Sequence, residues 1–531
     1  MEGDTGSGSV WPARRYETTS KRTLRTGFSV LGTFSDTTDS FGHLLGAHGL
    51  VRPPRNSCSD AFIVALNETC DGESWYTSTK ELQLASLEFC MACRTFQTLH
   101  LKVDPQTPRR LFAAVDPLLP HSKRPCLTRV PGLRARWVTW NIPTAEKLRI
   151  PIFAISDADY LQFGDAFEGS LDAVAWPCKL QTIVFCHSSR FNQAIELVQW
   201  SESLEVLGLG GRFNQSIEDV SWPDSLQTLS VGYEFNQPID LVQWPASLQR
   251  LEFRGRFNQR IDNVSWPDLL QTLEFGTNFN QPIEQASWPD SLQVLAFGND
   301  FKQPIEGVVW PASLKKIIFS LESFFNHPLE HVVWPMCLEK LVFGTLFDHP
   351  IERVAFPASL QDLTFGDTFD QPIEDVSWPD SIQRLVFGDY FNKPIDNVRW
   401  PASLREITFG WVDDGYYGRM KDRDNGIVIF SEFNQRLDRS AWPASLRRLT
   451  LGEKFRQSLH GLGTWMPNLD EFRLLDFDSG GESLLRGIEW PKGLRQLTVF
   501  EDSNLDGVEI PSTVKVSYPY NGGCFRAGAV V

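Results

Sequence analysis

Apolar residues recur through most of this chain at a spacing of 22 residues. In one copy, Leu292 to Phe297, the order is Leu-x-x-Leu-x-Phe, which places Leu295 and Phe297 on the same face of an extended segment. Each copy therefore predicts a short strand whose apolar face is turned inward. A repeat of about 20 to 50 residues is typical of a solenoid, in which every unit buries its apolar face against its neighbours. The expected fold class is mainly β, with the strands stacked into a parallel sheet.

A phenylalanine anchors each copy, and a tryptophan that is usually followed by proline recurs with it. Proline lacks an amide hydrogen and holds the preceding residue extended, so the return of each coil is predicted to be irregular rather than helical. We interpret the tryptophans as core residues, with an exposed sugar-stacking column as the alternative. The anchors are Phe167, Phe191, Phe213, Phe235, Phe257, Phe279, Phe301, Phe325, Phe347, Phe369, Phe391, Phe433 and Phe455.

A glycine follows the predicted strand in most copies. A turn at this point favours a positive φ, which glycine adopts at little cost. We therefore expect left-handed backbone at Gly232, Gly276, Gly298, Gly344, Gly366, Gly388, Gly410 and Gly452.

The repeat resembles that of the FNIP-repeat proteins, which are relatives of the leucine-rich-repeat (LRR) proteins. The segment Phe-Asn-Gln-Pro-Ile at 235–239 and 279–283, preceded by Pro-x-Ser-Leu-x-x-Leu-x-Phe-Gly, carries the resemblance. The resemblance implies an LRR-like parallel β-solenoid that presents a surface to protein partners, in some members beside an F-box or a kinase-like domain. Residues 1–130 contain neither pattern, so the substrate-receptor role of F-box proteins is not carried over.

An asparagine follows most anchor phenylalanines. A stacked amide can donate to and accept from backbone groups of the next coil, so this column is expected to be structural. Its clearest members are Asn192, Asn214, Asn236, Asn258 and Asn280.

A carboxylate occurs once in each of twelve successive copies. One interpretation is a local cap, in which each carboxylate accepts hydrogen bonds from turn amides or from a neighbouring coil. The other is a stripe that binds cations, although the Gly-Gly-x-Gly-x-Asp turns of calcium-binding β-rolls are missing. The central members are Glu218, Asp240, Asp262, Glu284 and Glu306.

The net charge of -16, from 50 Lys and Arg against 66 Asp and Glu, disfavours nucleic acid and anionic lipid as partners. No stretch of about 18 apolar residues predicts a membrane span, and no signal peptide is recognised. Nine cysteines, unevenly spread, do not indicate a disulfide framework, so a cytoplasmic or nuclear location is expected. The Arg, Ser and Thr of residues 14–25 leave organelle targeting open.

A metal, cofactor or catalytic site is not predicted. Cys90 and Cys93 form a Cys-x-x-Cys pair, with Cys58 and Cys70 upstream as conceivable zinc ligands, but the spacing favours buried thiols. The outward strand position between Leu and Phe, such as Ala296, is mostly small or β-branched and offers no nucleophile with a base.

Two places are candidates for binding a protein partner. The first is an insertion at residues 411–430, which gathers exposed aromatics, charges and glycines outside the repeat. The second is a rim just before the anchors, basic in early coils and acidic in later ones, with an indifferent solvated edge as the alternative. The candidate residues are Trp411, Asp413, Asp414, Tyr416, Tyr417 and Arg419 in the insertion, and Arg212, Arg254 and Arg256 on the rim.

The sequence predicts four successive regions. Residues 1–80 have a composition typical of partial disorder, and residues 81–165 contain degenerate coils or an N-terminal cap. The solenoid with its degenerate capping coils spans 166–515, and a tail follows at 516–531.

The expected function is that of a monomeric, non-enzymatic scaffold that binds another protein. One alternative is a glycan-binding or glycan-cleaving β-solenoid, which requires exposed tryptophans and paired carboxylates in one groove. The other is a structural repeat array without a specific partner.

Overall fold

The computed structural model describes residues 158–172, 174, 176–410, 431–475, 483–499, 505 and 507–518, together with the backbone of four strands before residue 141. The chain divides into two compact units, Met1–Leu133 and Arg134–Val531. In the first unit, β1 (Gly27–Leu31) pairs antiparallel with β2 (Phe62–Asn67), and β2 pairs parallel with β3 (Leu99–Val103). The predicted disorder of residues 1–80 and the four cysteines between Cys58 and Cys93 lie otherwise outside the described residues.

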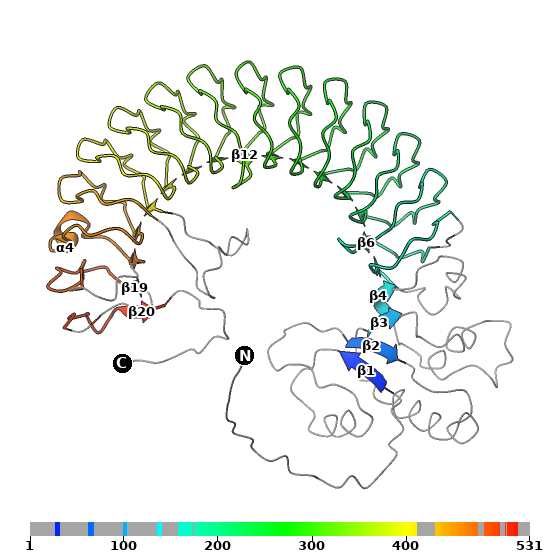
Figure 1. Ribbon diagram of the computed structural model, residues 1–531, viewed down its shortest axis with the longest axis horizontal. Helices are drawn as coiled ribbons and strands as arrows, with labels where there is room; N and C mark the ends of the chain where they lie inside the picture. Colours follow the sequence, from blue (N-terminus) through cyan, green and yellow to red (C-terminus); the bar gives the residue numbers. More distant parts are fainter. Residues whose placement is uncertain are drawn as a thin grey trace, which may run out of the picture. The chain divides into compact units, whose positions relative to one another are not determined.

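The second unit is a parallel β-solenoid, as the repeat predicts. From β4 onward each strand pairs in parallel with the next strand of the chain. The strands lie along the inner, concave side of the arc that the coils form, and the return segments lie on its outer side (Figure 1). The strands are β4 (Ala135–Trp140), β5 (Tyr160–Phe163), β6 (Thr182–Phe185), β7 (Val206–Gly208), β8 (Thr228–Val231), β9 (Arg250–Phe253), β10 (Thr272–Glu274), β11 (Val294–Phe297), β12 (Lys316–Phe319), β13 (Lys340–Val342), β14 (Asp362–Thr364), β15 (Arg384–Phe387), β16 (Glu406–Phe409), β17 (Arg448–Leu451), β18 (Glu471–Leu474), β19 (Gln496–Val499) and β20 (Lys515–Ser517).

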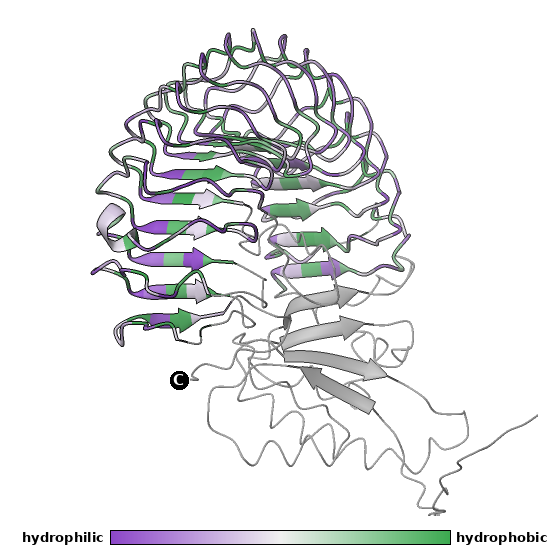
Figure 2. Ribbon diagram, turned by 60° about the vertical axis from the view of Figure 1, so that its left-hand side comes forward, coloured by the Kyte–Doolittle hydropathy of each residue, from purple (hydrophilic) through white to green (hydrophobic). Residues whose placement is uncertain are grey.

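The core consists of two columns of phenylalanine and a row of aliphatic strand residues. In β11, Leu295 and Phe297 point inward and are almost fully buried, and polar and apolar residues alternate along many of the strands (Figure 2). All thirteen anchor phenylalanines have no exposed surface. The ring of Phe279 stacks on Phe257 of the preceding coil, with 6.1 Å between centroids, and on Phe275 at 4.0 Å. Burial of such large rings in every coil is the main apolar contribution to stability.

The glycine after the strand is needed for space rather than for its φ. Of the eight glycines listed above, only Gly410 has a positive φ, so the sequence-based expectation is wrong for the others. A Cβ at Gly298 would overlap the carbonyl oxygen of Gly276, and one at Gly366 would overlap that of Gly344. At Gly298 and Gly366 successive coils therefore approach so closely that a side chain would collide with the preceding backbone.

A column of serines that the sequence analysis did not single out also joins the coils. The hydroxyl of Ser291 donates to the carbonyl of Leu270 in the preceding coil at 2.7 Å. Leu269 and Cys337 take this place in two coils, and both are exposed. Equivalent bonds are made by Ser225, Ser247, Ser313, Ser359, Ser381, Ser403 and Ser445.

The sequence predicts return segments without helix, and the described coils depart from this prediction at one place. A single helical turn, α4 (Leu462–Trp465), replaces the irregular segment in the coil before β18. The strands β18, β19 and β20 nevertheless continue the parallel pairing, so the degenerate C-terminal coils cap the sheet without changing its direction. Within the described part of the chain, no helix is long and apolar enough to cross a membrane.

Candidate partner-binding surface

Parallel pairing puts the turns that follow all the strands on one edge of the sheet, which we term the carboxyl edge. Arg212 follows β7, and Arg254 and Arg256 follow β9. The insertion leaves this same edge after β16, between Gly410 and Ser431. The structure therefore places the predicted arginines and the ends of the insertion on one edge, separated by the coils between β9 and β16.

The insertion interrupts a turn without disturbing the stack beneath it. The ring of Phe433, just after the insertion, lies 3.8 Å from that of Phe409, just before it. The amide of Glu432 donates to the carbonyl of Asp389 at 2.6 Å. The six candidate residues of the insertion, Trp411, Asp413, Asp414, Tyr416, Tyr417 and Arg419, lie outside the described residues.

The rim arginines differ in their partners. A guanidinium nitrogen of Arg256 lies 2.6 Å from a carboxylate oxygen of Glu234, and one of Arg254 lies 3.3 Å from Glu252. Arg212 is exposed and makes no ion pair within the described coils. On later turns of the carboxyl edge, Asp300 accepts a hydrogen bond from Asn278 at 2.7 Å.

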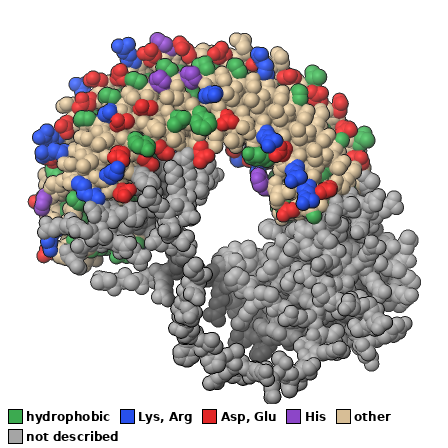
Figure 3. Space-filling view, viewed as in Figure 1, with side chains coloured by type: hydrophobic (Ala, Val, Ile, Leu, Met, Phe, Trp, Pro, Cys, Tyr) green, Lys and Arg blue, Asp and Glu red, His purple; other side chains and the backbone are tan. Residues whose placement is uncertain are grey.

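Four large apolar side chains that the sequence analysis did not single out are exposed on the carboxyl edge, in turns between the described coils: Tyr233, Phe324, Leu346 and Tyr390. Phe324, Leu346 and Tyr390 each stand immediately before an anchor phenylalanine and are 49%, 39% and 57% exposed. Tyr233 stands two residues before the anchor Phe235 and is 37% exposed. The position of an apolar residue just before an anchor is the sequence signal that identifies the other three. In the face seen in Figure 3, hydrophobic and acidic side chains gather along the middle of the inner edge of the arc, and basic ones near its right-hand end.

The asparagine column forms a hydrogen-bonded ladder along the solenoid. The side-chain oxygen of Asn258 accepts the backbone N–H of Asn280 at 2.9 Å and the amide of Gln281 at 3.0 Å. The rungs are half-buried or exposed rather than fully buried. Asp348 and Asp370 accept in the same way, whereas the side chain of Lys302 has no acceptor atom. The other rungs are Asn192, Asn214, Asn236, Asn280, Asn326, Asn392 and Asn434.

The acidic column is a solvated feature on the return segments. Glu284 and Glu306 are exposed, and Glu218 is half-buried. Asp262 is paired with Arg260, two residues before it, and Asp240 is exposed. Among the described residues, no group of three or more His, Cys, Asp or Glu side chains is arranged to hold a metal ion.

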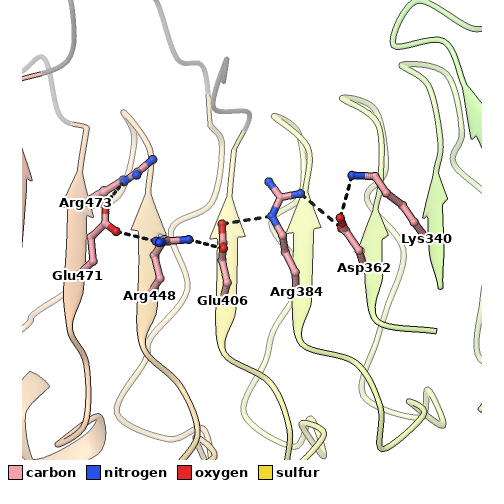
Figure 4. A network of polar contacts seen from close by, with 7 residues as sticks. All are labelled: Lys340, Asp362, Arg384, Glu406, Arg448, Glu471 and Arg473. Atoms are coloured by element: carbon pink, nitrogen blue, oxygen red, sulfur yellow. Dashed lines mark hydrogen bonds and ion pairs between the residues drawn. The ribbon is translucent and has the colours of Figure 1, made fainter. Parts of the chain in front are cut away.

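The concave face carries a ladder of alternating charges, drawn in Figure 4, which we term the charge ladder: Lys340, Asp362, Arg384, Glu406, Arg448, Glu471 and Arg473. The first six are the first residues of the six successive strands β13 to β18, and their Cα atoms are in register. Because this position points away from the core, each side chain lies beside the one on the next strand.

The carboxylates of the charge ladder each contact two cations. Asp362 lies 2.8 Å from Lys340 and 3.4 Å from Arg384. Glu406 lies 3.2 Å from Arg384 and 2.5 Å from Arg448. These side chains are between one-fifth and two-fifths exposed. Opposite charges directly across a sheet stabilise the pairing of the strands and hold the side chains in place.

Glu471 shows the electrostatic effect of the charge ladder. Burial of its carboxyl works to raise the pKa, but hydrogen bonds from Arg448 and Arg473, at 2.7 and 2.6 Å, outweigh burial and lower the pKa below its ordinary value. Burial works to lower the pKa of the Arg448 guanidinium. The contacts with Glu471 and Glu406 outweigh burial and raise this pKa above its ordinary value. Both shifts favour the ionised forms of Glu471 and Arg448.

A second, smaller cluster of charges lies on β9 and β10. Arg250 contacts Glu252 at 2.5 Å and Glu274 at 2.8 Å. The pKa of Glu252 is lowered, because its two arginine neighbours outweigh burial. Burial, aided by the charge of Glu252, raises the pKa of Glu274. Both glutamates contact Arg250, and the ionised form of Glu274 is stabilised less than that of Glu252.

The tryptophan column is stacked between coils and is nowhere fully exposed in the described coils. Trp176 lies 5.9 Å from Trp200 and Trp244 lies 6.3 Å from Trp266, in both cases with nearly parallel rings. The ring faces are therefore occupied by neighbouring indoles. This arrangement does not form the open aromatic platform that the glycan-binding alternative requires.

Comparison with protein-family models gives five tandem matches to the FNIP Repeat, at residues 191–234, 235–278, 279–322, 325–368 and 369–411. Each match spans two of the 22-residue coils described above. Among curated proteins, no sequence match was found.

Several solved structures are similar to this chain. CroV588, described as a novel circular LRR protein structure, is 23% identical, with 88% of this chain and 80% of that chain covered and a TM-score of 0.44. An internalin (inlF) from Listeria monocytogenes is 12% identical, with 70% and 84% covered and a TM-score of 0.34. A leucine-rich repeat protein from Bacteroides ovatus is 13% identical, with 68% and 88% covered and a TM-score of 0.16.

Proposed function

This chain is an FNIP-repeat protein, and from that premise we propose that it is a non-enzymatic scaffold that binds another protein. The partner is held on the concave face and the carboxyl edge of the solenoid. The chain acts as a monomer in the cytoplasm or nucleus. A repeat solenoid is suited to this role because stacking of equal units produces a long, continuous binding surface.

The observation that carries the proposal is the charge ladder on the concave face. Its five middle side chains, from Asp362 to Glu471, are each held by ion pairs to two neighbours, so little conformational entropy remains to be lost when a partner binds. Ordered charges of both signs favour specificity for a complementary surface more than raw affinity.

The carboxyl edge provides the second part of the surface. In this proposal Arg212, Arg254 and Arg256 contact the partner at one end, and the insertion contacts it further along through Trp411, Asp413, Asp414, Tyr416, Tyr417 and Arg419. The exposed rings of Phe324 and Tyr390 lie on the same edge, between these two groups. Exposed aromatic and arginine side chains are the residue types enriched at protein interfaces.

Two alternatives are less well supported. A glycan-binding or glycan-cleaving solenoid requires open tryptophan faces, whereas the described tryptophans stack on one another. A purely structural array without a partner would use the charge ladder only to stabilise strand pairing, and it gives no role to the exposed aromatic side chains of the carboxyl edge.

The experiment that tests the proposal is affinity capture with the intact chain and with a variant lacking residues 411–430, at physiological salt. The deletion is conservative for the fold, because it leaves three residues between Phe409 and Phe433, the same number that separates Phe297 from Phe301. We expect the deleted form to lose specific partners while its melting temperature stays within a few degrees of the intact chain.

A second variant tests the rim. It combines Arg212→Glu, Arg254→Glu and Arg256→Glu, and its matched control reverses Arg353, Arg399 and Arg495, which are exposed but lie away from the carboxyl edge. Loss of partners from the rim variant alone would support the proposal. If the intact chain captures no protein reproducibly, this result would contradict the proposed scaffold function and favour the structural array.

A further inference from the structure

The charge ladder ends abruptly at its β12 end. Lys316 occupies the next ladder position, directly opposite Lys340 in the register of β12 and β13. Like charges directly opposite each other on a sheet repel, so this pair departs from the alternation that the following strands maintain. Lys340 contacts Asp362, but Lys316 is exposed and has no carboxylate partner in the described coils.

The part of the concave face that runs from Lys316 to the far end of the charge ladder carries a surplus of positive charge. From β12 to β18 the outward strand positions hold five cations, the three ladder arginines with Lys316 and Lys340, against three carboxylates, which leaves two positive charges in excess. Each of the three carboxylates already contacts two cations, so none remains to compensate Lys316. This local surplus stands out in a chain whose net charge is -16.

The neighbourhood of Lys316 is apolar. Val294 and Ala296 on β11 and Ile318 on β12 point out of the sheet beside it, and all three are half-buried. Their small or branched side chains form a floor next to the lysine. A carboxylate bound to Lys316 would thus be partly shielded from water, which strengthens the ion pair.

From these observations we propose, resting on the scaffold function above, that the concave face at β11 to β13 binds a carboxylate side chain of the partner. The occupant is an extended peptide segment in which an acidic residue and an aliphatic residue stand two positions apart, so that both face the sheet. The carboxylate completes the ladder at Lys316 and Lys340, and the aliphatic side chain packs on Val294, Ala296 and Ile318.

The site is tested with a defined probe and the full chain. The probe is a fluorescein-labelled peptide with the sequence Glu-Ser-Leu-Ser repeated twice, and its control carries Gln in place of Glu. We expect fluorescence polarisation to show at least about tenfold tighter binding of the Glu probe, with the difference reduced at high salt. Equal binding of the two probes would overturn the proposal.

Lys316→Glu supplies the decisive comparison. A carboxylate at this position faces Lys340 and completes the alternation within the chain itself, so the melting temperature should stay the same or rise. Binding of the Glu probe should nevertheless fall to the level of the Gln probe. The matched control is Lys302→Glu, an exposed lysine on the return segment, which should leave probe binding unchanged.

Lys316→Met is a second variant that controls for a loss of structure in Lys316→Glu. It keeps a long side chain and removes only the charge. Retention of Glu-probe binding by either Lys316 variant would overturn the carboxylate site. If affinity capture by the Lys316→Glu variant still recovers the partners of the intact chain, the scaffold function stands and this site alone is wrong.

Discussion

The hydroxyl of Ser440 accepts a hydrogen bond from the indole N–H of Trp400 at 2.9 Å and donates one to the carbonyl of Ile395, also at 2.9 Å. In most other coils a valine stands where Ser440 stands, and the corresponding indole N–H groups have no acceptor. The nine indoles concerned are those of Trp176, Trp200, Trp222, Trp244, Trp266, Trp288, Trp310, Trp334 and Trp378. The solenoid therefore contains a column of buried indole N–H groups that pack against apolar side chains and have no acceptor. Ser440 supplies the missing acceptor in one coil.

Replacement of Ser440 by Ala should destabilise the chain by about 1 to 3 kcal/mol, because it leaves the buried indole N–H of Trp400 without an acceptor. Ser440→Val should cost less, since it restores the packing of the other coils. The comparison is Ser445→Ala, which removes one half-buried bond to Leu404. Urea unfolding followed by tryptophan fluorescence measures all three, and equal costs for Ser440→Ala and Ser445→Ala would contradict the explanation.

Removal of a central rung of the asparagine ladder should lower stability. Asn258→Ala leaves the backbone N–H of Asn280 without its acceptor. The side-chain amide of Gln281 loses one of its two acceptors and keeps the backbone carbonyl of residue 258. Because the rung is half-buried, water replaces part of the loss, and we expect a cost of about 1 kcal/mol. Lys302→Ala is the control, since the side chain of Lys302 accepts no hydrogen bond and its backbone carbonyl, which contacts His327 of the next coil, is kept. The midpoint of this variant in thermal unfolding should remain close to that of the intact chain.

Two glycines should respond to alanine for different reasons. Gly298→Ala brings a methyl group against the backbone of Gly276, so the coils must separate and we expect a loss of more than about 2 kcal/mol. At Gly307 no atom lies within 4 Å of an added Cβ, but φ is 85°. Alanine there should cost only about 1 to 2 kcal/mol. Chemical denaturation of the two variants gives the order, and a smaller effect at Gly298 would refute the role of close approach.

The charge ladder should make stability depend on pH through Glu471. Its pKa in the folded chain lies below the ordinary value of 4.5, so its ionised form contributes stability above about pH 4.5, and this contribution is lost as the pH falls through the lowered pKa. Glu471→Gln should therefore cost about 1 to 3 kcal/mol at pH 7 and progressively less below pH 4.5. Glu306→Gln, on the exposed acidic column, is the control. A cost for Glu471→Gln that does not change with pH would show that packing, not charge, is responsible.

The strands, their inward faces and their parallel pairing are predictable from the sequence because a 22-residue period leaves one consistent way to bury Leu295 and Phe297 in every coil. The reason for the glycines is not predictable in the same way. A positive φ and a close approach of backbones both select glycine, and only the position of the neighbouring carbonyl distinguishes them.

The candidate surface is predictable only in part. Parallel pairing places Arg212, Arg254 and Arg256 on the same edge as the two ends of the insertion, and their contact with a partner stays a prediction. The charge ladder was missed because the first outward position of each strand varies from copy to copy, and its order has meaning only once the strands are in register. The alternation of charge becomes visible in the sequence when the copies are aligned and this one position is compared, as in Lys340, Asp362 and Arg384.

Each coil offers the next one the same set of acceptors that it uses itself, from the asparagine oxygen to the leucine carbonyl that receives a serine. The junction between any two coils is therefore interchangeable with most others. A segment of 22 residues can be removed or duplicated at the level of the gene, and the cut ends will meet groups that already fit. The number of coils, and with it the length of the concave face, can therefore change by whole repeats to suit the size of the molecule that the face binds.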